Sequence, residues 1–233
     1  MRVAPAFQYA DSKGNTGPNW RETVTCTSCN MNNRQRLVAR LLQQSLLESS
    51  ERTPQRVYFM EQVTPIFAWA KACLKNIELI GSEYLGPQYA GAQVVNGIRH
   101  EDVMNLSFED NSVNFIISND VFEHVPDPKK AFRECARILA PGGVMLATIP
   151  FGVMGDVSRV RATLTNGAIT HLVPPEFHGN PLSMKGSLVF HDYGWDLMDT
   201  FIECGFAKAD CELYYDHEFG HFGEGLLIFR VAK

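Results

Sequence analysis

A segment in the middle of the chain constrains the fold more than any other. Val113 to Ser118 (VNFIIS) is a short apolar run rich in β-branched and aromatic residues, which is the pattern of a parallel strand buried on both faces. Asp127 and Pro128 follow as a helix N-cap and a first helical residue. Val144 to Ile149 then resumes as a second buried strand. A strand, a helix and another buried strand in this order predict a parallel α/β sheet.

Polar side chains follow each predicted strand at its carboxyl end. Ligands of open α/β sheets bind beyond these ends, so the side chains are placed where a ligand would lie. An acid about 20 residues after the first strand's loop is positioned to accept hydrogen bonds from the ribose of a bound nucleoside. The series therefore predicts a site for an adenosine-containing ligand. In chain order its members are Glu61, Glu83, Asp102 and Asn119.

The segment SVNFIISNDVFEHV, the helix after it, and LAPGG leading into a strand resemble a known family. They are similar to the class I S-adenosylmethionine-dependent methyltransferases, in particular the small-molecule methyltransferases with an "EHV" signature. The resemblance is specific from Gly97 to Phe151 and extends more weakly upstream to Val57. It implies a Rossmann-like, doubly wound α/β fold with a seven-stranded, mostly parallel sheet and an antiparallel last strand. It also implies S-adenosylmethionine as the cofactor and methyl transfer as the activity.

The same resemblance assigns cofactor contacts residue by residue. Glu83 would hold the ribose and Tyr84 would lie against the adenine, while Asp102 would meet the adenine amino group. The full set of expected cofactor-binding residues is Glu61, Gln62, Thr64, Glu83, Tyr84, Asp102, Val103, Asn119 and Asp120.

The loop after the first predicted strand departs from the family pattern. The family has glycines here, which let the backbone approach the cofactor, whereas this chain has Glu61-Gln-Val-Thr-Pro65. Thr64 and Pro65 still predict a helix N-terminus, whose N–H groups and dipole suit a carboxylate. A catalytically inactive methyltransferase-like binding or scaffold protein therefore stays open as the alternative to an enzyme. A nicotinamide-dependent reductase is a third hypothesis, but it needs the glycines more strictly because a pyrophosphate must sit against the backbone.

Two further patterns have the spacing of metal ligands. Asp120, Glu123 and His124 could share one face of a helix, and they resemble the ExxEH metal motif of small-RNA 2′-O-methyltransferases and some quinone-pathway O-methyltransferases. The bare EHV segment also occurs in many methyltransferases without metal, so we predict no metal site. Cys26 and Cys29 form a CxxC, but no second CxxC or CxxH follows, and we interpret them as two thiols in a turn.

The remaining segments are expected to cover the sheet. Residues 1–50 predict an N-terminal arm and helical cover, and residues 51–233 the methyltransferase-like domain. Within that domain, residues 152–193 show no clear helix or strand period and many prolines, glycines and histidines, which predicts a substrate-binding cap. His178 and His191 are the candidate catalytic bases of this cap, since an imidazole can take the proton of a substrate hydroxyl.

The arm is expected to be irregular as far as residue 25 and to continue into a helix from about Asn33 to Glu48. Arg36 and Arg40 fall opposite the apolar stripe of this helix, so a solvated face is expected for them.

Charge and hydropathy limit the classes of partner and the cellular location that are expected. The 233 residues have a formal net charge of −5 and contain no run of lysine or arginine, which argues against nucleic acid and membrane surfaces and favours a small-molecule substrate. Apolar runs are too short for a membrane span and the first ten residues lack the apolar core of a signal peptide, so a cytoplasmic location is expected. The acceptor, the atom methylated (O, N or C) and the oligomeric state stay open.

Overall fold

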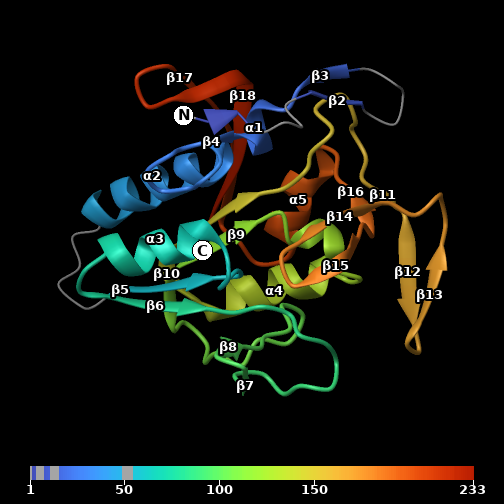
Figure 1. Ribbon diagram of the computed structural model, residues 1–233. Coiled ribbons are helices and arrows are strands. Elements are labelled where there is room, and N and C mark those ends of the chain that lie inside the picture. Colours follow the sequence, from blue (N-terminus) through green and yellow to red (C-terminus); the bar gives the residue numbers. More distant parts are fainter. Residues whose placement is uncertain (1, 4–7, 11–15, 49–54) are drawn as a thin grey trace.

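A six-stranded twisted sheet forms the centre of the computed structural model, which describes residues 2–3, 8–10, 16–48 and 55–233 (Figure 1). The strands are ordered β17-β18-β10-β9-β5-β6. Their bounds are β5 (Gln55–Phe59), β6 (Ile77–Gly81), β9 (Val113–Asn119), β10 (Leu139–Thr148), β17 (Lys208–Asp216) and β18 (His221–Ala232). The first four run parallel, and β18 is antiparallel to both β10 and β17. The expected Rossmann-like, mostly parallel sheet with an antiparallel last strand is confirmed.

The seventh position of the sheet is filled by a single bridge instead of a full strand. Beyond the end of β6, Glu83 pairs in parallel with His100. The residues just before His100 form a hairpin of β7 (Val94–Val95) and β8 (Ile98–Arg99). Its two-residue loop is Asn96-Gly97, and both residues have positive φ, 51° and 79°. Among the residues that the structure describes, this bridge is the only pairing at the outer edge beyond β6.

Helices cover both faces of the sheet, because successive strand residues point to opposite sides. On one face α2 (Asn33–Glu48) and α3 (Pro65–Cys73) pack over Phe59 and Ile117. On the other face α4 (Pro128–Ile138) and α5 (Asp196–Glu203) pack over Tyr58 and Ile116. These four strand side chains are fully buried.

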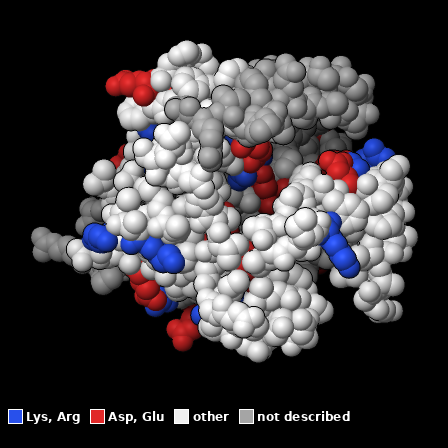
Figure 2. All heavy atoms as spheres, viewed as in Figure 1, with Lys and Arg blue, Asp and Glu red and all other residues white. Residues whose placement is uncertain are grey.

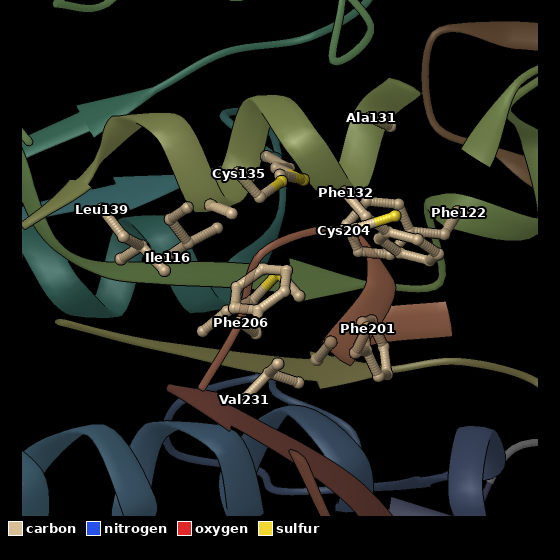
Figure 3. Close-up of a cluster of buried hydrophobic side chains, with 14 of the residues drawn as sticks. Ile116, Phe122, Ala131, Phe132, Cys135, Leu139, Phe201, Cys204, Phe206 and Val231 are labelled. Atoms are coloured by element: carbon tan, nitrogen blue, oxygen red, sulfur yellow. The ribbon is translucent and has the colours of Figure 1, made fainter. Parts of the chain in front are cut away.

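The face under α4 is the more aromatic of the two. Figure 3 shows Phe132 and Cys135 of α4 in this cluster, with Phe201 of α5 below Phe132 in the view. The Phe132 and Phe201 ring centroids are 4.7 Å apart in an edge-to-face arrangement. The sequence sets this helix locally: Asp127 accepts a hydrogen bond from the Lys130 amide at 3.0 Å, and Pro128 follows as the first helical residue.

The predicted helix from Asn33 to Glu48 is confirmed, but the prediction of a solvated arginine face is wrong. Arg36 donates to the Gly220 carbonyl at 2.6 Å, and Arg40 pairs with Asp216 at 2.9 Å. Both arginines therefore fasten α2 to the turn between β17 and β18. A helical face pattern cannot reveal such partners, because they lie more than 170 residues away in sequence.

The cap at residues 152–193 is built of hairpins, so the expectation of an irregular segment is wrong. The Asn166-Gly167 loop joins two of its strands with φ values of 51° and 79°, which match the right-handed strand twist. Short, mostly exposed strands give no buried alternation, and for that reason the period-2 pattern is weak here. The strands are β11 (Arg159–Val160), β12 (Ala162–Thr165), β13 (Ala168–His171), β14 (Phe177–Asn180), β15 (Ser183–Leu188) and β16 (His191–Asp192).

Part of the expected irregular arm lies outside the described residues, and its described parts are short regular elements. They are β1 (Arg2–Val3), β2 (Gln8–Ala10), β3 (Thr16–Pro18), α1 (Trp20–Thr23) and β4 (Val24–Thr25). Among the described residues, no helix combines the length and the apolar character needed to cross a bilayer.

Candidate functional site

The carboxyl ends of the parallel strands open into one cavity of about 1180 Å³. Its walls come from the ends of β5, β6 and β9, from α1 and α2, and from the cap. Figure 2 shows charged side chains of both signs gathered in a hollow near the centre of one face. Most of the predicted site residues line this cavity: Glu61, Thr64, Glu83, Tyr84, Asp102, Val103, Asn119, Asp120 and His178.

Two predicted residues, Gln62 and His191, do not line the cavity. The Gln62 side chain donates to the Gly97 carbonyl at 2.7 Å and accepts from the Arg99 amide at 2.8 Å, which ties its loop to the β7–β8 hairpin. His191, on β16 of the cap, is buried, and its ring stacks on Tyr193 with centroids 5.9 Å apart. Burial lowers the pKa of His191.

Glu83 shapes the glycine-free loop. One of its carboxylate oxygens accepts hydrogen bonds from two successive loop amides, Gln62 N at 2.6 Å and Val63 N at 3.0 Å. Burial raises the pKa of Glu83, and the two amide donors act against that rise. The other carboxylate oxygen, Oε2, accepts neither of these two amide hydrogen bonds.

Glu61 and Asn119 meet at the adjoining ends of β5 and β9. The Asn119 amide donates to the Glu61 carboxylate, and both side chains are buried. Burial raises the pKa of Glu61. Next to them α3 begins at Pro65, and the Thr64 side chain makes no capping bond. The first-turn N–H groups of α3 therefore lack a side-chain cap, which leaves a positive helix end beside the cavity.

Asp120 lies in a charge cluster with two arginines that the sequence interpretation missed. Arg21 of α1 contacts both Asp120 oxygens, and Arg34 of α2 lies 3.4 Å from one of them and donates to Thr148 at 3.2 Å. Burial alone would raise the pKa of Asp120, but the two guanidinium groups hold it well below its usual range. No local pattern marks Arg21, because only the docking of α1 on the sheet brings it to the site.

At the cap side of the cavity, Glu123 and His124 come from a single 3-10 turn, η1 (Phe122–His124). His178 of β14 faces them: its Nδ1 lies 3.5 Å from Glu123 Oε1, and His124 Nε2 lies 3.6 Å from the same oxygen. Asp120 is engaged by its arginines. The sequence spacing had suggested that Asp120, Glu123 and His124 share one helical face, and this arrangement is wrong. The third side chain beside Glu123 and His124 is His178.

Cys26 and Cys29 are free thiols at a turn in which the Asn30 amide donates to the Cys26 carbonyl at 3.0 Å. Among the described residues, no histidine, aspartate or glutamate joins them in a metal-binding group.

Comparison with known proteins identifies the fold and the domain. The family described as "Methyltransferase domain" matches residues 47–147. A "Probable S-adenosylmethionine-dependent methyltransferase" of Mycolicibacterium smegmatis is 32% identical over 117 residues, covering 48% of this chain and 41% of that protein. A demethylmenaquinone methyltransferase of Staphylococcus epidermidis is 30% identical over 88 residues, covering 38% of this chain and 29% of that protein. The chain thus spans less than half the length of these relatives.

A solved structure has the same fold. It is the 1,6-didemethyltoxoflavin-N1-methyltransferase of Burkholderia thailandensis, which contains bound 1,6-didemethyltoxoflavin and S-adenosylhomocysteine. The alignment has a TM-score of 0.50 and 13% identity, and it covers 86% of this chain and 78% of that one. The sheet order, the polar strand ends around one cavity and the matching domain lead to one conclusion: residues 47–147 match a methyltransferase domain, and the chain has the fold of S-adenosylmethionine-dependent methyltransferases.

Proposed function

We propose that this chain transfers a methyl group from S-adenosylmethionine to a small-molecule acceptor. The observation that carries the proposal is the mixed lining of one cavity: strand-end carboxylates and amides form part of its wall, and cap residues form another part. A cavity of about 1180 Å³ exceeds what one drug-sized ligand needs, so it has room for a cofactor and an acceptor together. In this proposal residues 51–233 form the catalytic domain, residues 152–193 its cap and residues 1–50 its cover.

The residues at the strand ends fit the cofactor. Glu83 keeps one carboxylate oxygen for ribose hydroxyls while the other holds the loop, and Tyr84 is 57% exposed, which leaves its ring available for an adenine face. The uncapped start of α3 offers N–H groups to the carboxylate of the methionine moiety, and buried Glu61 offers an acceptor to its amino group. When bound, the cofactor supplies a methyl group on a positively charged sulfur. The chain's own contribution is then to position the acceptor and exclude water.

Two observations support a small-molecule acceptor. The cap closes over the cavity with mixed apolar and polar side chains, among them Leu164, Asn180 and Phe190. The Staphylococcus epidermidis relative is named for demethylmenaquinone, which is a small molecule. We infer the same acceptor class for this chain.

The experiment is calorimetric titration of the full chain with S-adenosylhomocysteine, repeated on Glu83→Gln. Glutamine keeps a carbonyl oxygen for the Gln62 and Val63 amides, so the loop retains its anchor while the ribose loses a charged acceptor. A hydrogen bond to a charged group contributes about 1.5–3 kcal/mol, so we expect binding about 10- to 100-fold weaker in the variant.

The control is Glu109→Gln, which removes an exposed carboxylate remote from the cavity and should leave the affinity unchanged. Absence of saturable binding by the unaltered chain would reject methyl transfer and favour the inactive binding or scaffold protein. Equal affinities of the unaltered chain and Glu83→Gln would remove Glu83 from the ribose site.

A further inference from the structure

Glu123 is a buried carboxylate that lacks hydrogen-bond partners. Its side chain is 0% exposed, and neither of its oxygens has a donor within hydrogen-bonding geometry. A buried carboxylate without partners costs several kcal/mol, and proteins resolve such cases with an ion pair or a metal. Two histidines face this carboxylate, His124 from the same turn and His178 from the cap.

His124 presents a lone pair to Glu123. Its Nδ1 lies 2.8 Å from the Leu188 backbone carbonyl, which can only accept. Nδ1 therefore carries a proton, and in the neutral tautomer Nε2 presents its lone pair toward Glu123 Oε1 at 3.6 Å. A ring nitrogen fixed in this way by a backbone carbonyl is the usual arrangement of a metal-bound histidine.

His178 repeats this arrangement from the cap. Its Nε2 lies 3.4 Å from Glu176 Oε1, and its Nδ1 lies 3.5 Å from Glu123 Oε1. When His178 Nε2 carries the ring proton, the lone pair of Nδ1 faces Glu123 Oε1. The distances of 3.5 and 3.6 Å from Glu123 exceed the usual range of about 2.7–3.2 Å for an N–H···O hydrogen bond, so neither ring makes a regular hydrogen bond to this carboxylate.

The three donor atoms have the spacing that a single cation requires, since they all lie within 4.8 Å of one another. Tetrahedral zinc with ligands at about 2.0–2.1 Å places its donor atoms about 3.4 Å apart, close to the two separations above. We propose that Glu123, His124 and His178 hold one divalent transition-metal ion of the zinc type. Two imidazoles and one carboxylate are a donor set for such ions rather than for magnesium or calcium.

The position of the site indicates its role. His124 and His178 line the cavity while Glu123 lies behind them, so the fourth coordination position faces the acceptor side. Three protein ligands and one open position are typical of catalytic zinc. This inference rests on the proposed methyl transfer and assigns it a hydroxylated acceptor, because a cation there stabilises the oxygen after its proton leaves to water. That oxygen forms the new O–C bond, the S–CH₃ bond breaks, and its electron pair stays on sulfur.

The test is titration of the metal-stripped full chain with ZnCl₂, with MnCl₂ and MgCl₂ as comparison arms. Cys26→Ser/Cys29→Ser is the background, because the CxxC thiols could bind zinc by themselves. We expect one zinc ion per chain, weaker binding of manganese and weakest binding of magnesium, and retention of zinc binding in the control His171→Asn, whose histidine is exposed on β13.

His178→Asn is the informative variant, since His178 is partly exposed on the cap and its loss should leave the sheet folded. We expect zinc affinity to fall at least about 100-fold. Cobalt offers a second measurement: tetrahedral visible bands should appear in the Cys26→Ser/Cys29→Ser background and disappear in His178→Asn.

Absence of zinc binding by the background protein, or equal affinity in His178→Asn, would overturn the proposal and leave an ion pair between Glu123 and His178. The proposed function is judged separately by S-adenosylhomocysteine titration of the metal-stripped chain. Cofactor binding without zinc binding would refute only the metal site, and zinc binding without cofactor binding would refute only methyl transfer.

Discussion

Replacing Asp120 with Asn should destabilise the chain by a defined amount, because Asp120 fastens α1 to the end of β9. Its carboxylate contacts Arg21 and Arg34 and accepts a hydrogen bond from Thr148 Oγ1 at 3.0 Å. The Asp120 side chain is only 18% exposed, so solvent screens these contacts little.

The magnitude follows from the pKa of Asp120, which falls from 3.8 to about 2 in the folded chain. One pKa unit corresponds to about 1.4 kcal/mol, so the ionised carboxylate contributes about 2 kcal/mol at neutral pH. Because the folded pKa lies below the unfolded one, the contribution is complete above pH 5 and is lost as the pH falls toward 2. About half of it should remain at pH 3. Glu22 still compensates both arginines in the variant, which keeps the loss below the about 3–5 kcal/mol typical of breaking a buried pair.

Urea unfolding followed by tryptophan fluorescence measures this free energy at pH 7 and pH 3. We expect the unaltered chain to exceed Asp120→Asn by about 2 kcal/mol at pH 7 and by about half of that at pH 3. Asp110→Asn is the matched control, since Asp110 also pairs with an arginine but its side chain is 69% exposed, and its loss should change stability by less than about 0.5 kcal/mol. The reasoning fails if Asp120→Asn lowers the free energy of unfolding at pH 7 by no more than Asp110→Asn does. It also fails if the difference in unfolding free energy between the unaltered chain and Asp120→Asn is as large at pH 3 as at pH 7.

Two further outcomes concern stability. Burial and the charges of Arg36 and Arg40 lower the pKa of His221 to about 4, so stability should fall by about 3 kcal/mol as the pH drops from above 6.5 to 4. Urea titrations across this range should show a flatter profile for His221→Leu, and an unchanged profile would contradict the assignment. Phe132→Ala removes a fully buried ring and should cost about 3–5 kcal/mol in thermal or urea unfolding, whereas Phe177→Ala, at 56% exposure, should cost less than 1 kcal/mol.

The sheet and its ligand edge were predictable because their signals are local. Val113, Phe115, Ile116 and Ile117 are apolar at positions that the doubly covered strand β9 buries, and Asp127-Pro128 fixes where the next helix begins. Once the strands are parallel, their carboxyl ends share one edge, so Glu61, Glu83 and Asn119 meet without any knowledge of packing.

The other walls of the site depend on docking between distant segments. Arg21 reaches Asp120 across 99 residues, and His178 reaches Glu123 across 55 positions of sequence. A side chain that pairs only after two elements dock leaves no periodic trace in the sequence. The β12–β13 hairpin of the cap was missed for a different reason, because its signal is local. Asn166-Gly167 lies between two short β-prone runs, and this pattern strongly predicts a hairpin.

The absence of glycine in the loop after β5 does not by itself close the cofactor edge. Glycine is needed where φ is positive or where a side chain would fill the space for a ligand. None of the residues from Glu61 to Thr64 has positive φ, so the backbone conformation makes no demand for glycine. Gln62 and Val63 do not line the cavity, and Val63 is 39% exposed on the outside. The Glu83 carboxylate fixes the loop through two amides, and this side chain thereby sets the path of the loop without any glycine.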